Sequence, residues 1–168
     1  MGGATDLFDL GRLSLASGEG RRLDLDVIRR TAGLYEEVVV AVVNRSVRKN
    51  NALFGIDERV AFIEHAITGM QNVRVEPFST LVVDFAKGIG AKAIVKGLRA
   101  ISDFEYELEM NQLNRRQAPE VESVYLMASP QYSFLSSSGV KELATFGGRI
   151  DDLVPDEVAL RLQEELRR

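Results

Sequence analysis

The sequence has no cysteine and only one histidine, His65, among its 168 residues. Without thiols the chain forms no disulfide, and a single imidazole is too few for a zinc site of the usual ligand type. No apolar run is long enough to cross a bilayer, and the first residues do not combine a basic start with an apolar stretch. These absences predict a cytoplasmic protein with no secretion signal and no membrane partner.

An excess of basic residues is also lacking. The 21 lysines and arginines are outnumbered by 25 acidic residues, which gives a formal net charge of −4. This balance argues against a broad nucleic-acid surface, although it leaves room for a small basic pocket that binds a phosphorylated metabolite. Hydrophobic residues make up 45% of the chain, enough for the core of one globular domain.

From about residue 25 onward, apolar runs of strand length alternate with segments of helical period. Strands are expected at 36–43, 72–78, 91–95 and 121–128, and helices at 25–35, 55–67, 80–90, 102–116, 136–148 and from about 155. A capping box from Ser102 to Glu105 is expected to open the helix at 102–116. Short connections between alternating strands and helices indicate parallel strands with right-handed crossovers. The expected fold class is α/β: a doubly wound open parallel sheet whose ligands bind beyond the carboxyl ends of its strands.

The join between the third expected strand and its following helix reads Lys96-Gly97-Leu98-Arg99. Glycine lets the backbone turn sharply or come close to a ligand, and the flanking cations can hold phosphate oxygens. The positive end of the helix dipole lies in the same region. The alternative is a surface turn with solvated cations, and these four residues alone do not decide between the two.

Two further stretches could contact an anion. Three serines, 136–138, precede a helix and offer hydroxyls and backbone N–H groups suited to a triphosphate, although an ordinary serine N-cap would explain them as well. Arg45, Arg48 and Lys49 form a basic loop after the first long strand. Such loops are usually just solvated, but this one would lie at the carboxyl edge of the sheet.

Several runs together resemble the phosphopantetheine adenylyltransferase family. They read LDVIRRTAGLYEEVVVAV, IDERVAFIE, LVVDFAKGIGAKAIVKGLRAISDFEYELEMNQLN and YSFLSSSGVKELATFGGRIDDLVP, and they extend from about Leu25 to the C-terminus. The resemblance implies a Rossmann-like nucleotidylyltransferase domain at 25–168, preceded by an atypical segment at 1–24. It also implies transfer of the adenylyl group of ATP to 4'-phosphopantetheine, with Mg²⁺, by a homo-oligomer that in this family is a hexamer.

The resemblance also implies site residues. The positions that match the family's ATP contacts are Gly97, Leu98, Arg99, Glu107, Tyr132, Ser133, Phe134, Leu135, Ser136, Ser137 and Ser138. Lys96 matches the basic residue that meets the phosphate of 4'-phosphopantetheine, and Val82 matches an apolar backbone contact to the same substrate. Lys49, or alternatively Arg48, matches the lysine expected in the basic loop. No protein ligand for a metal is assigned.

The sequence departs from the family pattern before Leu25. The family's T/H-x-G-H motif ends in a histidine that stabilises the transition state, but Asp24 occupies that place and Leu23 replaces the preceding glycine. Only Phe8 and Asp9 remain of the family's early glycine-rich loop, and no first strand is visible. The catalytic residue is therefore left unassigned.

Three explanations of this departure remain open. The segment before Leu25 could differ from the natural one, for example through a frameshift. The chain could instead be a catalytically impaired homologue that binds nucleotide or pantetheine, or another group, such as Arg21 or Arg22, could replace the histidine. Another adenylyl- or cytidylyltransferase of the same superfamily fits the run KGLRAISDFEYE less closely.

Overall fold

The computed structural model describes residues 5–9, 22–44 and 53–166, with only the backbone at 5–9 and at 102. The strands are β1 (Thr5–Asp9), β2 (Glu37–Val43), β3 (Val73–Phe78), β4 (Ala91–Leu98) and β5 (Glu122–Met127). The helices are α1 (Arg22–Ala32), α2 (Ile56–Ala66), α3 (Val82–Gly88), α4 (Ile101–Gln117), the 3₁₀ helix η2 (Pro130–Tyr132), α5 (Ser137–Thr145) and α6 (Asp156–Leu166). This alternation confirms the α/β fold class.

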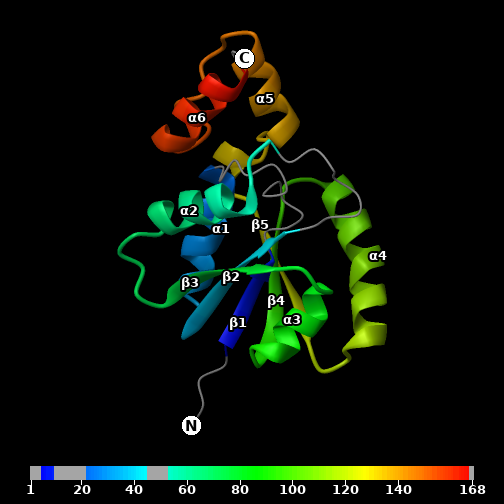
Figure 1. Cartoon of the computed structure of the whole chain (residues 1–168). Helices are drawn as coiled ribbons and strands as arrows, with labels where there is room; N and C mark the ends of the chain where they lie inside the picture. The colour runs from blue at the N-terminus through cyan, green and yellow to red at the C-terminus, as the bar shows by residue number, and fades with distance from the viewer. Residues whose placement is uncertain (1–4, 10–21, 45–52, 167–168) are drawn as a thin grey trace.

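The five strands form one parallel sheet in the order β3-β2-β1-β4-β5. Helices α1 and α2 cover one face and α3 and α4 the other (Figure 1). The strand residues explain this layering, because Val38 and Val40 pack with α1 and α2 whereas Val39 and Ala41 pack with α3. Strands β2 and β3 extend the sheet on one side of β1, and β4 and β5 extend it on the other side, so the order of the strands reverses between β1 and β4. Ligands of doubly wound sheets bind beyond the carboxyl ends of the strands at such a switch point.

The sequence shows no visible strand before Leu25, but the structure contains one. Strand β1 lies at the centre of the sheet and pairs with β2 on one side and β4 on the other, with Leu7 opposite both Val39 and Ile94. Its sequence, TDLFD, is short and contains two aspartates, so it gives little local signal. The strand forms because two neighbouring strands satisfy its backbone.

At the β4–α4 join, one of the two interpretations of Gly97 and the capping box expected at Ser102 are wrong. Strand β4 continues through Leu98, with Gly97 opposite Leu126, so Gly97 is an ordinary strand residue and does not form a turn. The glycines with positive φ among the described residues are Gly69, Gly90 and Gly147. Helix α4 begins at Ile101 with Ala100 as its N-cap, so no capping box starts at Ser102.

Helices α5 and α6 lie together beyond the carboxyl ends of the strands (Figure 1). They share a separate hydrophobic core that includes Leu135, Val140 and Leu162 and reaches back to Leu23 at the start of α1. The serine cap expected for α5 is confirmed, because Ser136 Oγ accepts a hydrogen bond from the Gly139 N–H at 3.0 Å. Among the described helices, none has both the length and the apolar character that a membrane span requires.

Candidate active site

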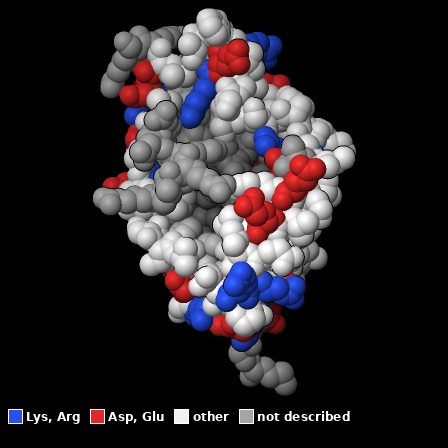
Figure 2. Space-filling view, turned by 90° about the vertical axis from the view of Figure 1, so that its right-hand side faces the viewer, with Lys and Arg blue, Asp and Glu red and all other residues white. Residues whose placement is uncertain are grey.

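The carboxyl ends of β4 and β5 lie side by side. Leu98 is opposite Met127, and the Ala128 N–H donates to the Leu98 carbonyl at 2.7 Å. The chain after β4 supplies Arg99 and the start of α4, while the chain after β5 supplies η2 and the start of α5. The predicted run 132–138 and the predicted Arg99 are thereby brought to the same edge of the sheet. On the side of the molecule where α4 lies, Figure 2 shows a hollow with acidic and basic side chains along one rim.

Arg99 is held in place from two directions. Its Nε and one terminal nitrogen donate to the two carboxylate oxygens of Asp103, each at 2.9 Å, and its other terminal nitrogen donates to the Leu135 carbonyl at 2.8 Å. The Arg99 backbone N–H also donates to Asp103, at 3.0 Å. A guanidinium has further N–H donors beyond these three side-chain contacts, so the held side chain can still bind phosphate oxygens.

The electrostatics of this pair follow from its half-buried position. Burial raises the pKa of the Asp103 carboxyl, but the hydrogen bonds and charge of Arg99 outweigh burial, so the pKa lies below its ordinary value. A lowered carboxyl pKa contributes stability that is present above the unfolded-state pKa and is lost as pH falls through the folded-state pKa. The hydrogen bonds from Arg99 to Asp103, together with the one to the Leu135 carbonyl, form a clamp on Arg99. The Asp103 part of this clamp is therefore intact at neutral pH and weakens only in acid.

Lys96 and Glu107, two predicted binding residues, contact each other. The Lys96 Nζ on β4 lies 2.9 Å from the Glu107 Oε2 on α4, and the two side chains are only 4% and 8% exposed. By resemblance these residues address different substrates, and sequence reasoning did not predict that they would pair. This buried ion pair fixes both side chains close to the carboxyl end of β4.

The run 132–138 divides into packed and accessible side chains. Leu135 is buried in the core shared by α5 and α6, and Tyr132 packs against the same core. Phe134, in contrast, is 70% exposed. The Ser137 hydroxyl is buried at the first residue of α5 and has no hydrogen-bond partner among the described residues. This run therefore offers an exposed ring, a buried hydroxyl and the positive end of α5 close together.

The remaining hydroxyls of this run have separate surroundings. Ser133 Oγ donates to the Pro130 carbonyl at 2.9 Å, whereas Ser138 is exposed. Ser136 serves as the cap of α5, as described above. These hydroxyls therefore lie just before α5 and in its first turn.

The other predicted residues lie elsewhere or are not described. Val82 is the first residue of α3, beyond the carboxyl end of β3, and packs against the core on that face. Lys49, with Arg45 and Arg48, lies outside the described residues. Asp24 is 1% exposed in the first turn of α1, where a carboxylate interacts favourably with the helix dipole.

Two aspartates at this edge of the sheet were missed by sequence reasoning. Asp103 fixes Arg99, and Asp26 on α1 accepts a hydrogen bond from Ser129 Oγ at 2.7 Å. For Asp103 the local signal was an opposite charge four residues from Arg99, although Arg99 lies ahead of α4 and not on the helix. The partner of Asp26 lies 103 residues away, so no local pattern could have identified it.

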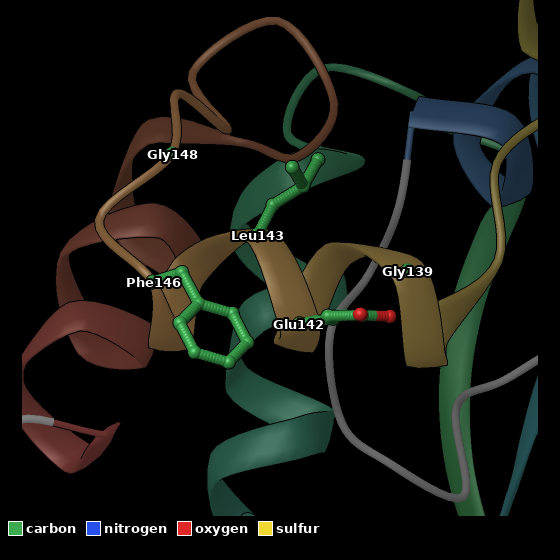
Figure 3. Close-up of a pocket in the computed structure, with 5 residues that line it drawn as sticks. All are labelled: Gly139, Glu142, Leu143, Phe146 and Gly148. Atoms are coloured by element: carbon green, nitrogen blue, oxygen red, sulfur yellow. The ribbon is translucent and has the colours of Figure 1, made fainter.

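A separate groove lies along the surface of α5 and has a volume of about 370 Å³. It is lined by Gly139, Glu142, Leu143, Phe146 and Gly148 (Figure 3). None of the predicted site residues lines this groove, and it is therefore distinct from the site around Arg99. Among the described residues, no group of three or more His, Cys, Asp or Glu side chains is arranged to hold a metal ion.

Comparison with known proteins identifies the family. The sequence profile of the family described as cytidylyltransferase-like matches residues 24–143. Proteins named phosphopantetheine adenylyltransferase from Heliobacterium modesticaldum and Alkaliphilus metalliredigens are 49% and 48% identical to this chain over 141 and 134 residues. These alignments cover 84% and 80% of this chain, and 83% and 84% of the two relatives. The chain belongs to the phosphopantetheine adenylyltransferase family.

Membership of the phosphopantetheine adenylyltransferase family confirms the resemblance predicted from the sequence, and with it a nucleotidyltransferase of coenzyme A biosynthesis. A solved structure from Vibrio parahaemolyticus, described as a candidate nicotinate-nucleotide adenylyltransferase, superimposes with a TM-score of 0.68 and covers 99% of this chain and 96% of its own. At 15% identity it supports the fold alone. The family profile begins at Asp24, so it includes the predicted nucleotide contacts and all but the first two residues of α1, but not β1.

Proposed function

We propose that this chain transfers the adenylyl group of ATP to 4'-phosphopantetheine, giving dephospho-coenzyme A and pyrophosphate. A phosphate oxygen of the acceptor attacks the α-phosphorus of ATP, and the bond from that phosphorus to the oxygen bridging to the β-phosphate breaks. The clamp on Arg99 is the observation that carries the proposal. It fixes a cation between Asp103 and the Leu135 carbonyl, at the edge of the sheet where the run 132–138 enters α5.

The residues divide between the two substrates in this proposal. The nucleotide lies against Gly97, Leu98, Arg99, Glu107 and the run 132–138. The phosphate of 4'-phosphopantetheine lies near Lys96, with Val82 and Lys49 as further contacts. Such an arrangement suits phosphoryl-type transfer, which depends mainly on positioning the reactants and neutralising their charge.

Magnesium enters this proposal together with the nucleotide. Mg²⁺ in phosphoryl-transfer sites is commonly held by substrate phosphates, waters and one or two carboxylates, not by a cage of protein ligands. When bound, the ion would neutralise triphosphate charge beside Arg99.

A second candidate function is binding of nucleotide or pantetheine without turnover. It is favoured by Asp24, a buried carboxylate in the first turn of α1 where the family's histidine is expected. A carboxylate at that position would repel the negative charge that develops in the transition state.

The deciding experiment measures pyrophosphate release from ATP and 4'-phosphopantetheine by the full chain, with Mg²⁺, alongside calorimetric titration of each ligand. Release that requires both substrates supports the adenylyltransferase. Binding of either ligand without release supports the second candidate. Absence of both binding and release would overturn the two proposals together.

Replacing Arg99 by lysine is expected to weaken ATP binding by roughly tenfold or more. Lysine keeps the charge but cannot donate to both Asp103 oxygens and to the Leu135 carbonyl at once, and hydrogen bonds to charged groups are worth about 1.5–3 kcal/mol each. Calorimetric titration with ATP measures the change. Arg149→Lys, on a side chain that is 87% exposed, is the matched control. A dissociation constant within about twofold of the parent chain's would contradict the assigned role of Arg99.

We further propose a cytoplasmic homo-oligomer, which by family resemblance would be a hexamer. The cytoplasmic assignment rests on the metabolites that the proposed reaction uses. The assembly is supported by helix α4, which exposes four large apolar side chains: Ile101, Phe104, Leu108 and Leu113. Exposed apolar surface of this extent on one helix is typical of an interface. Sedimentation equilibrium can measure the oligomeric state.

A further inference from the structure

We propose that Asp26 is a positioning residue for the nucleotide: it fixes the chain that leads from β5 into the run 132–138. The inference rests on the proposed function, because that run is the proposed nucleotide contact. Asp26 belongs to α1, which packs on the opposite face of the sheet from α4 (Figure 1). The residue therefore acts on the run from the side away from Arg99.

The contacts of Asp26 form a small polar cluster with the end of β5. The Asp26 Oδ2 accepts a hydrogen bond from the Ser129 hydroxyl at 2.7 Å and a longer one from the Ser129 backbone N–H at 3.4 Å. Arg30, one turn further along α1, donates to the Met127 carbonyl at 2.7 Å and lies 3.4 Å from the same carboxylate oxygen. The cluster thus holds the two residues on either side of Ala128.

The segment between β5 and α5 is consequently fixed at two points. Asp26 and Arg30 hold it at 127–129, and Arg99 holds it at Leu135 through that residue's carbonyl. Between the two points lie η2 and the exposed ring of Phe134. Loss of either anchor lets this short stretch shift, and a shift there moves groups that contact the nucleotide.

The packing of α1 does not depend on this cluster. Leu25 and Ile28 bury the apolar side of α1 against the sheet, whereas the Asp26 side chain remains 19% exposed. The polar contacts of Asp26 are therefore separable from the helix that carries them. Removing the carboxylate should change the run 132–138 more than it changes the stability of the fold.

The expected effect is selective for one substrate. Asp26→Ala should raise the dissociation constant for ATP on the order of tenfold, since it removes charge-assisted hydrogen bonds from one of the two anchors. The dissociation constant for 4'-phosphopantetheine should stay within about twofold. Asp26→Asn keeps an acceptor oxygen for Ser129 and should recover most of the lost ATP affinity.

The experiment uses the full chain and a double-mutant cycle. Asp26→Ala, Ser129→Ala and the double variant are titrated with ATP and with 4'-phosphopantetheine, and Asp156→Ala, an exposed aspartate in the first turn of α6, is the control. If Asp26 acts through Ser129, the double variant should bind ATP about as weakly as Asp26→Ala alone. Additive effects, or equal loss of both ligands, would overturn the positioning role.

Hydrogen exchange of the ligand-free proteins separates this inference from the proposed function. Amides at 128–138 should exchange faster in Asp26→Ala than in the parent chain, while amides of α6 should not change. Unchanged exchange at 128–138 would overturn the anchor itself. Failure of the parent chain to bind ATP would overturn the proposed function, while the exchange result would still decide whether Asp26 fixes this segment.

Discussion

Replacing Asp24 by histidine is expected to raise kcat for pyrophosphate release by roughly 10²–10³-fold over the parent chain. By family resemblance Asp24 stands where the family's histidine is expected, and the structure buries it in the first turn of α1. A carboxylate there repels the negative charge that builds on the α-phosphate during adenylyl transfer, whereas an imidazole can donate a hydrogen bond to that phosphate. The measurement is the initial rate of release at saturating ATP and 4'-phosphopantetheine.

Asp24→Asn is the matched control, because it removes the negative charge without supplying an imidazole. We expect its kcat to lie between those of the parent chain and Asp24→His. Equal rates in the two variants would assign the gain to lost repulsion alone. No gain in either variant would contradict the prediction, and it would favour a replacement group elsewhere or a need for the family's residues ahead of Leu25.

The fold from residue 25 onward could be predicted because its signals are local. The apolar run of β2 and the helical period of α2 each fix an element within about ten residues. Strand β1 could not be predicted, since TDLFD lacks a run or alternation of its own and is stabilised by pairing with strands distant in sequence. Predicting β1 would have required information on contacts between residues that are distant in sequence.

The candidate site shows the same division. Arg99 and the run 132–138 lie at the carboxyl edge of the sheet, as parallel strands require. The pairing of Lys96 with Glu107 was not predicted, because β4 continues two residues past Lys96 and the orientation of α4 decides which glutamate meets this lysine. The role of Asp26 could not be predicted for a similar reason, since its partner, Ser129, lies 103 residues away in sequence.

Replacing Lys96 by methionine is expected to destabilise the fold by about 3–5 kcal/mol, as is typical when one partner of a buried ion pair is removed. The variant leaves the Glu107 carboxylate, 8% exposed, without the cation that lies 2.9 Å away. The desolvation of that carboxylate is then no longer offset by this contact. Urea unfolding followed by circular dichroism measures the loss, provided that the slope of the transition is unchanged.

Lys92→Met on the same strand is the control, because Lys92 is exposed and should tolerate the change with an effect within about 0.5 kcal/mol. The double variant Lys96→Met with Glu107→Leu should recover the lost stability, since apolar replacements of buried pairs are often neutral or stabilising. A single variant as stable as the parent, or a double variant no better than the single, would refute this account. A stable double variant that no longer binds 4'-phosphopantetheine would separate the two roles of the pair: the fold tolerates its loss, and the buried charges are kept for the substrate.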